Sequence, residues 1–268
     1  MTGLDAEGTD PSESLILSVC TTSYNIAHAI ERHFSSVCNA LAGISFEYVV
    51  VDNRSSDGTA EILSRLAHSF PGFKVIARRC SRGIGRRLAA SASKAPTILC
   101  VDADTVYRPS LGAFVRLYLK EFRSRDIALQ AIYAGLYPRS LWFQVGGTRD
   151  LNYAEDLDLW MRIWELGRMK WTPVLMGENL KPSGVRDSED VFYKRYSMLS
   201  RVSRVLRRET DMWRLRRYYK MDLEAIWRSS AVDLGIGMLQ ETWFGNRPSW
   251  SLRGTAQRIR RDFREILS

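Results

Sequence analysis

FEYVVVDNRSSDGT, residues 46–59, gives the clearest indication of the fold. Its first six residues are apolar apart from Glu47 and rich in valine, which predicts a strand that is buried on both faces. The run ends at Asp52, and a short polar turn follows. From residue 58 to residue 70 the apolar residues recur at helical spacing. A strand, a turn and a helix in succession form one unit of an α/β protein.

The same unit recurs on both sides of this stretch. We expect strands at residues 15–20, 46–51, 73–77 and 97–101, with helices at residues 27–41, 58–70 and 84–95. Apolar strands that alternate with helices predict a mainly parallel sheet covered by helices. Such sheets bind ligands beyond the carboxyl ends of their strands, so we expect the functional site there.

Length and composition are consistent with a folded α/β protein. The chain has 268 residues, of which 45% are hydrophobic and 26% charged, so it can bury a core. We predict a flexible tail at residues 1–13, an α/β domain at residues 14–184 and a helical, basic region at residues 185–268. The tail is acidic and lacks an apolar stretch, which argues against a signal peptide. No window reaches the ~18 apolar residues expected of a membrane-spanning helix.

The cysteines and histidines argue against a structural zinc site. The four cysteines lie far apart and form no C-x-x-C pair, and all three histidines precede residue 69. We interpret the cysteines as reduced, which is typical of a cytoplasmic protein. The expected location is therefore the cytoplasm, with the protein either soluble or peripherally associated with a membrane.

The strongest single motif is Asp102-Ala103-Asp104, which directly follows the apolar run at residues 97–101. Two carboxylates on alternate residues offer the hard oxygen ligands that Mg²⁺ or Mn²⁺ binds together with phosphate oxygens. The alternative is a pair of turn carboxylates that cap the next element. The position at the end of a buried strand favours the metal site.

Two further aspartates follow the strand at residues 46–51. Asp52 ends that strand and could accept a hydrogen bond from the imide N–H of uracil or guanine, so we favour base recognition. Asp57 precedes Gly58 and Thr59, and for it we favour an ordinary helix N-cap.

Glycines do not follow the first strand, which excludes the G-x-G-x-x-G fingerprint of dinucleotide-binding sheets. Gly83 and Gly85 form a G-x-G only after the third strand. A loop that needs positive φ explains that pair equally well.

A third acidic segment begins at Glu155 and has helical spacing up to residue 166. We expect Asp158 and Arg162, four residues apart, to pair on the surface of this helix. Asp156 and Asp158 point about 200° apart on a helix, so both cannot face one site. Spacing alone leaves open which acid is catalytic.

Taken together, these segments resemble the family 2 glycosyltransferases, which have the GT-A fold. VCTTSYN is similar to the family's first-strand T-Y-N, and VVVDNRSSDGT to its V-V-D-D/N-G-S-T-D-G-T. RGIGRRLAASASKAPTILCVDADT is similar to the region leading into its D-x-D, and VGGTRDLNYAEDLDLWMRIWELG to its G-G-F…E-D-x-D-L-W-x-R block. The resemblance implies an inverting, metal-assisted enzyme that moves one sugar from a UDP- or GDP-linked donor to a hydroxyl acceptor.

Roles for individual residues follow from the same resemblance. The residues implied around the nucleotide-sugar are Thr22, Tyr24, Asn25, Asp52, Arg82 and Asp102. The implied ligands of Mg²⁺ or Mn²⁺ are Asp104 and Asp102, and Asp156 would be the general base. A general base is needed because the attacking hydroxyl must lose its proton, while the metal neutralises charge on the leaving diphosphate.

Some positions depart from the family pattern. Arg54 replaces a usual glycine, and Thr148 stands where phenylalanine usually follows Gly-Gly. The short interval between Asp104 and Val145 and the absence of Q-x-x-R-W favour transfer of a single sugar. The alternative functions are a catalytically inactive, GT-A-like scaffold and a sugar-phosphate nucleotidyltransferase. The latter would need a glycine-rich basic loop after the first strand.

The basic character of the chain lies near its C-terminus. Of the formal net charge of +9, all but one unit falls in residues 181–268. Arginines alternate with apolar and aromatic residues at 200–221, which is typical of a helix that lies on an anionic membrane. Packing against the core explains the same pattern. We favour membrane contact and include lipid-linked acceptors, whereas nucleic-acid binding is disfavoured because the enzyme-like motifs lie elsewhere.

Overall fold

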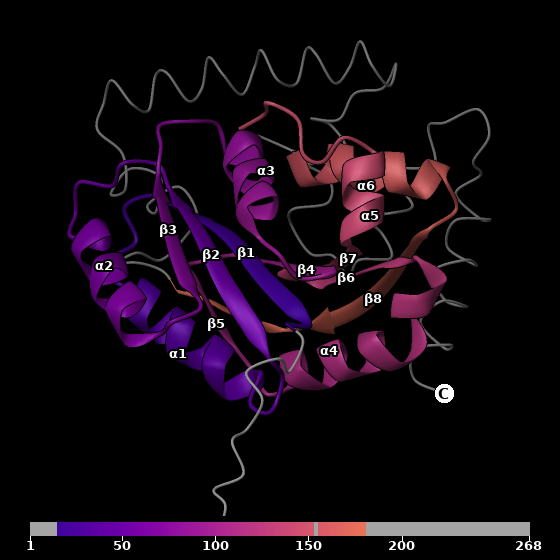
Figure 1. Cartoon of the computed structure of the whole chain (residues 1–268), viewed down its shortest axis with the longest axis horizontal. Coiled ribbons are helices and arrows are strands. Elements are labelled where there is room, and N and C mark those ends of the chain that lie inside the picture. The colour runs from indigo at the N-terminus through magenta and orange to yellow at the C-terminus, as the bar shows by residue number, and fades with distance from the viewer. Residues whose placement is uncertain (1–14, 153–154, 181–268) are drawn as a thin grey trace, which may run out of the picture.

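The computed structural model describes residues 15–152 and 155–180, which form a sheet with helices on both faces (Figure 1). The main sheet contains β1 (Leu17–Ser23), β2 (Phe46–Asp52), β3 (Phe73–Ala77), β4 (Thr97–Val101), β6 (Ala128–Ile132), β7 (Ala134–Pro138) and β8 (Met169–Leu175). A separate ribbon contains β5 (Thr105–Tyr107) and β9 (Gly177–Asn179). The helices are α1 (Ile30–Ala40), α2 (Thr59–Ser69), α3 (Arg82–Ala92), α4 (Ser110–Glu121), η1 (Arg123–Arg125), α5 (Arg139–Gln144) and α6 (Glu155–Glu165).

The strand order of the main sheet is β3-β2-β1-β4-β7-β6-β8. The first four strands in this order are parallel to one another, and β6 is parallel to β8. Among the described strands of this sheet, β7 alone runs against its neighbours, β4 and β6. The predicted mainly parallel α/β architecture is therefore confirmed.

Two apolar layers fill the space between the sheet and its helices. Alternate residues of a strand point to opposite faces. Tyr48 and Val50 of β2 pack with α1, α2 and α4, whereas Val49 and Val51 pack with α3, α5 and α6. Figure 1 shows these two groups of helices on opposite sides of the sheet. Burial on both faces explains why the strand sequences are continuously apolar.

The first strand is longer than the sequence predicted. It continues through Thr21, Thr22 and Ser23, which were expected in the following loop. Two of these polar side chains are buried but satisfied: Thr21 Oγ1 donates to the carbonyl of Val101, and Ser23 Oγ donates to Asp52 Oδ1. Hydrogen bonds to neighbouring strands thus allow polar residues to extend a buried strand.

Two expectations about turns were wrong in detail. Gly83 and Gly85 lie in the first turn of α3, and neither has the positive φ expected of a loop. The cap of α2 is Gly58, so Asp57 precedes the cap position. The Asp57 carboxylate nevertheless accepts the backbone N–H of Thr59, as well as that of Ala27.

The proposed tail at residues 1–13 and the basic region at residues 185–268 lie outside the described residues. None of the helices in the described part of the chain is long and apolar enough to cross a membrane. All four cysteines are free.

Candidate active site

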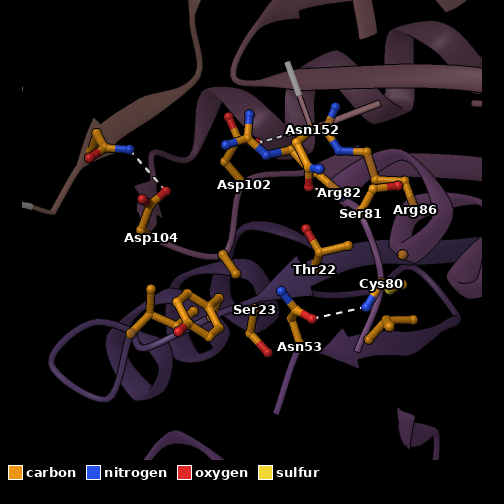
Figure 2. Close-up of a pocket in the computed structure, with 16 residues that line it drawn as sticks. Thr22, Ser23, Asn53, Cys80, Ser81, Arg82, Arg86, Asp102, Asp104 and Asn152 are labelled. Carbon is orange, nitrogen blue, oxygen red and sulfur yellow. Dashed lines mark hydrogen bonds and ion pairs between the residues drawn. The ribbon is translucent and has the colours of Figure 1, made fainter. Parts of the chain in front are cut away.

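A cavity of about 260 Å³ lies at the carboxyl ends of β1, β2 and β4 (Figure 2). This volume far exceeds the ~30 Å³ of one water molecule. The residues that line it are Thr22, Ser23, Tyr24, Ile26, Val51, Asn53, Cys80, Ser81, Arg82, Gly85, Arg86, Asp102, Ala103, Asp104, Asn152 and Asn179. The cavity thus lies at the edge of the sheet where a ligand site was expected.

The structure brings together most of the residues that the sequence singled out. Those that line the cavity are Thr22, Tyr24, Arg82, Asp102 and Asp104. Asn25 and Asp52 do not line it. Instead, Asn25 Oδ1 accepts the N–H of Ser56, which ties the loop after β1 to the loop after β2.

Asp52 is 1% exposed, and its carboxylate is occupied by neighbouring groups. Oδ1 accepts hydrogen bonds from the hydroxyls of Ser23 and Ser55, and Oδ2 accepts the N–H of Ser55. The next residue, Asn53, does line the cavity, and its Oδ1 accepts the N–H of Cys80 at 3.0 Å. Asn53 was not among the predicted site residues, although it directly follows Asp52 in the same motif.

The two acids of Asp102-Ala103-Asp104 differ in their partners. Asp102 Oδ1 lies 2.9 Å from the guanidinium of Arg86, and Asp104 Oδ1 accepts a 2.9 Å hydrogen bond from Asn179. Burial raises the pKa of Asp102 to about 6; Arg86 opposes this shift, and the negative charge of Asp104 adds to it. Two carboxylates that repel each other at the edge of a cavity form a suitable environment for a cation.

Buried hydrogen bonds hold the acidic loop in place. The hydroxyl of Tyr107 accepts the N–H of Asp102 at 3.0 Å and donates to the carbonyl of Tyr133. His33 of α1 contacts the carbonyl of Thr105 through Nδ1 and the hydroxyl of Tyr48 through Nε2, both at 2.7 Å. Because a carbonyl can only accept, the proton of His33 is assigned to Nδ1.

Arg86 is the central cation of the site, and the sequence analysis did not identify it. Its side chain is 13% exposed and lines the cavity. One guanidinium nitrogen pairs with Asp102, while the other lies 3.4 Å from Glu155 Oε1 and 3.8 Å from Asp156 Oδ2. The available signal was the spacing of Arg82 and Arg86, which lie four residues apart on one face of α3.

The two adjacent acids at the start of α6 have different environments. The side chain of Glu155 is 1% exposed, whereas that of Asp156 is 28% exposed. Burial raises the pKa of Glu155, and the charges of Arg82 and Arg86 oppose that shift. Asp156 is therefore the acid of this pair that is more accessible to an incoming molecule.

Asp158 pairs with Arg162 at 2.6 Å, as expected, but the expected surface location was wrong. The carboxylate of Asp158 is fully buried, and Arg149 forms a second ion pair with it at 3.0 Å. Arg162 also donates to the backbone carbonyls of Val145 and Gly147. This network holds the Gly-Gly turn against α6, so the burial of Asp158 is compensated.

Close packing at the start of α3 explains its glycines and one departure from the family pattern. A Cβ on Gly83 would overlap the backbone carbonyl of Arg149, and a Cβ on Gly85 would lie 2.6 Å from Cγ2 of Thr22. Thr148 is buried and donates a 2.7 Å hydrogen bond to the carbonyl of Gly83. At position 148, where the family pattern has phenylalanine, a threonine hydroxyl thus forms a hydrogen bond that holds the start of α3.

Comparison with protein families identifies the class of this protein. Residues 18–174 match the model described as "Glycosyl transferase family 2". This segment spans β1 to β8 and contains the acidic loop and α6. The chain belongs to glycosyl transferase family 2, and the resemblance inferred from its motifs is confirmed.

Individual relatives agree with this assignment. Over 97 residues the chain is 33% identical to dolichol-phosphate mannosyltransferase from Pyrococcus furiosus, a match that covers 35% of this chain and 27% of that protein. The chain thus matches about a quarter of the length of this curated relative.

Solved structures share the fold at low sequence identity. S. aureus TarS 1–349 in complex with UDP-GlcNAc has a TM-score of 0.55 at 15% identity, covering 94% of this chain and 90% of that one. Mannosyltransferase PcManGT from Pyrobaculum calidifontis in complex with GDP-Man and Mn²⁺ has a TM-score of 0.53 at 15% identity, covering 96% and 88%. At this identity, these likenesses establish the fold alone.

Proposed function

We propose that this enzyme transfers one sugar from a nucleoside-diphosphate sugar to a hydroxyl acceptor, with metal assistance and with inversion at the anomeric carbon. The observation that carries the proposal is that two carboxylates line one cavity and that a third lies next to a cation that lines it. Asp102 and Asp104 line the cavity, and Asp156 Oδ2 lies 3.8 Å from Arg86, which lines it as well. The solved relatives named above contain UDP-GlcNAc or GDP-Man, which supports this class of donor.

The residues at the cavity fit a divalent cation. Asp102 and Asp104 carry carboxylate oxygen atoms of the kind that Mg²⁺ and Mn²⁺ prefer, and a cation would relieve the mutual repulsion of these two acids. In the described part of the chain, no group of three His, Cys, Asp or Glu side chains is arranged to hold a metal ion. The chemistry that a bound cation supplies is neutralisation of the charge that develops on the leaving diphosphate.

Protein side chains supply the remaining steps of the proposed reaction. Arg82, whose side chain is 48% exposed, would contact the donor from the first turn of α3. Thr22 and Tyr24 would surround the nucleotide beyond β1. Asp156 would accept the proton of the attacking hydroxyl, since a general base must be accessible to its substrate. Attack from the side opposite to the leaving group inverts the anomeric centre.

Direct recognition of the base by Asp52 would require its carboxylate to reach the base as a hydrogen-bond acceptor. The buried carboxylate of Asp52 would act by orienting the turn at Ser55, with Asn53 exposed to the cavity beside it. Either uracil or guanine is compatible with an amide at this position, because both bases present a carbonyl oxygen and an N–H group.

A thermal-shift experiment tests the proposal. We expect UDP or GDP to raise the melting temperature in the presence of Mn²⁺ and to do so much less in the presence of EDTA, because a ligand that binds only the folded state stabilises it. AMP and inorganic phosphate serve as controls. Equal shifts with and without the metal, or no shift with any nucleoside diphosphate, would contradict the proposed function.

A further inference from the structure

Arg86 contacts both functional sides of the cavity. It projects from α3 towards Asp102 of the acidic loop after β4 (Figure 2). Its guanidinium also lies against the first turn of α6. Asp102, on the proposed donor side, lies 2.9 Å from one nitrogen of its guanidinium. Glu155 and Asp156, on the proposed acceptor side, lie 3.4 and 3.8 Å from the other. A single planar group therefore spans the gap between two elements that the chain separates widely.

The electrostatic environment keeps this guanidinium charged. The carboxylates of Asp102, Glu155 and Asp156 lie 2.9, 3.4 and 3.8 Å from it, and an arginine guanidinium keeps its charge in proteins. Among the described residues, neither carboxylate oxygen of Glu155 has a hydrogen-bond partner, although that side chain is almost fully buried. Arg82 and Arg86 are the cations next to it. Arg86 thus lies against a buried acid on α6 and also holds an acid on the donor side.

We propose that Arg86 is a positioning residue that fixes Asp156 relative to Asp102 and thereby aligns the two halves of the reaction. The inference rests on the proposed function, because it assigns the acceptor side to Asp156. The fork of an arginine can bind two carboxylates at once, whereas the single ammonium of lysine cannot span them in the same way. Arg86 therefore acts on the alignment of donor and base rather than on the affinity for the donor.

The test is a comparison of Arg86→Lys with Arg87→Lys in the full chain. Arg87 is the neighbouring residue of α3, is exposed and does not line the cavity, so the same substitution there controls for helix and charge effects. A misplacement of about 1 Å can cost about a hundredfold in rate. We expect Arg86→Lys to lower kcat for nucleotide release from the donor by about that factor, with the donor KM within threefold of wild type. Arg87→Lys should leave both constants within twofold.

A second measurement tests the bridge without using activity. A double-mutant cycle of Arg86→Lys and Asp156→Asn, measured by urea unfolding, gives the coupling free energy between the two side chains. All four proteins of the cycle also carry Glu155→Gln, which replaces the buried carboxyl group that could otherwise prevent folding of the Arg86 variants. A coupling beyond experimental error supports the bridge. Zero coupling overturns it, whether or not the wild type turns over a donor.

The kinetic outcomes are equally decisive. Three kinetic results would overturn the positioning role. They are a normal kcat for Arg86→Lys, a change in Arg86→Lys that affects only the donor KM, and a decrease in the kcat of Arg87→Lys as large as that of Arg86→Lys. A wild type that binds no nucleoside diphosphate instead contradicts the proposed function, and the unfolding cycle then decides the bridge alone.

Discussion

The side-chain amide of Asn179 donates a 2.9 Å hydrogen bond to Oδ1 of Asp104, although 75 residues separate the two positions. Antiparallel pairing of β5 with β9 brings them together, and the N–H of Leu180 also donates to the carbonyl of Asp104. The last described strand therefore holds the second acid of the D-x-D motif.

Removal of this hydrogen bond should weaken metal binding. In Asn179→Ala the carboxylate of Asp104 loses a partner that orients it, and the loss of such a partner typically costs about 10–100-fold in metal affinity. We expect that decrease in the Mn²⁺ affinity of the nucleotide-bound protein, measured by isothermal titration calorimetry. Glu178→Ala, an exposed change in the same strand, should leave the affinity unchanged. Equal affinities for Asn179→Ala and wild type would show that Asp104 needs no support from β9.

The sequence predicted the sheet and the location of the site because both depend on local patterns. Continuous apolar runs indicated buried parallel strands, and Asp102 and Asp104 were found at the cavity because they directly follow β4. Asn179 and Arg86 were not identified because their roles depend on contacts between distant segments. The spacing of Arg82 and Arg86 places both on one face of α3, but it does not indicate which distant acids they contact.

Burial of charge was equally inaccessible from the sequence. Asp158 has the spacing of a surface ion pair with Arg162, yet it is fully buried because Arg149 supplies a second partner from outside the helix. The backbone conformation of Arg54 was also inaccessible from the sequence. This exposed residue stands where the family usually has glycine, and its φ of 54° retains the left-handed conformation despite the side chain.

Gly83 should not tolerate a side chain. A methyl group in Gly83→Ala would overlap the carbonyl of Arg149, and overpacking of this kind typically costs about 1–3 kcal/mol. We expect a loss of that size in the free energy of unfolding, measured with urea. Ser91→Ala, at an exposed position of the same helix, should change it by less than about 0.5 kcal/mol. A fully stable Gly83→Ala would mean that α3 does not pack closely on residues 149–151.

Stability should fall in mild acid because of His33. Burial lowers the pKa of His33 from 6.5 to about 4, opposed by the Thr105 carbonyl and by the charge of Asp104. The unfolded chain therefore binds the proton more readily, and the contribution of His33 is lost as pH falls from about 6.5 to about 4. Between pH 7 and pH 5 we expect a loss of about 2 kcal/mol from this group.

Urea unfolding of wild type and His33→Gln at both pH values isolates this contribution. Glutamine can form hydrogen bonds with the Thr105 carbonyl and the Tyr48 hydroxyl but does not titrate. The free energy of unfolding of the His33→Gln variant should therefore depend less on pH over this interval than that of the wild type. The phenol of Tyr48 stays neutral throughout, because burial raises its pKa. Parallel pH profiles for the two proteins would contradict the assigned role of His33.

Asp156→Asn should remove transfer while leaving donor affinity nearly unchanged. Asparagine keeps the shape of aspartate but cannot take up a proton at neutral pH, and general-base assistance typically contributes about 10²–10⁴-fold to kcat. Glu155→Gln is the matched control, because Glu155 is adjacent but almost fully buried. Its kcat should fall much less than that of Asp156→Asn. A normal rate for Asp156→Asn together with an inactive Glu155→Gln would reverse the assignment.

The central claim is that Asp104 supports metal-assisted use of a nucleotide-sugar at this cavity. The most direct test is nucleoside-diphosphate release from UDP- and GDP-sugars, measured for wild type and Asp104→Asn over a series of Mn²⁺ concentrations. We expect the rate of release by the wild type to rise with Mn²⁺, and no such rise for a folded Asp104→Asn, because that variant lacks a ligand of the metal. Release by Asp104→Asn with the same rate and the same Mn²⁺ dependence as wild type would contradict it.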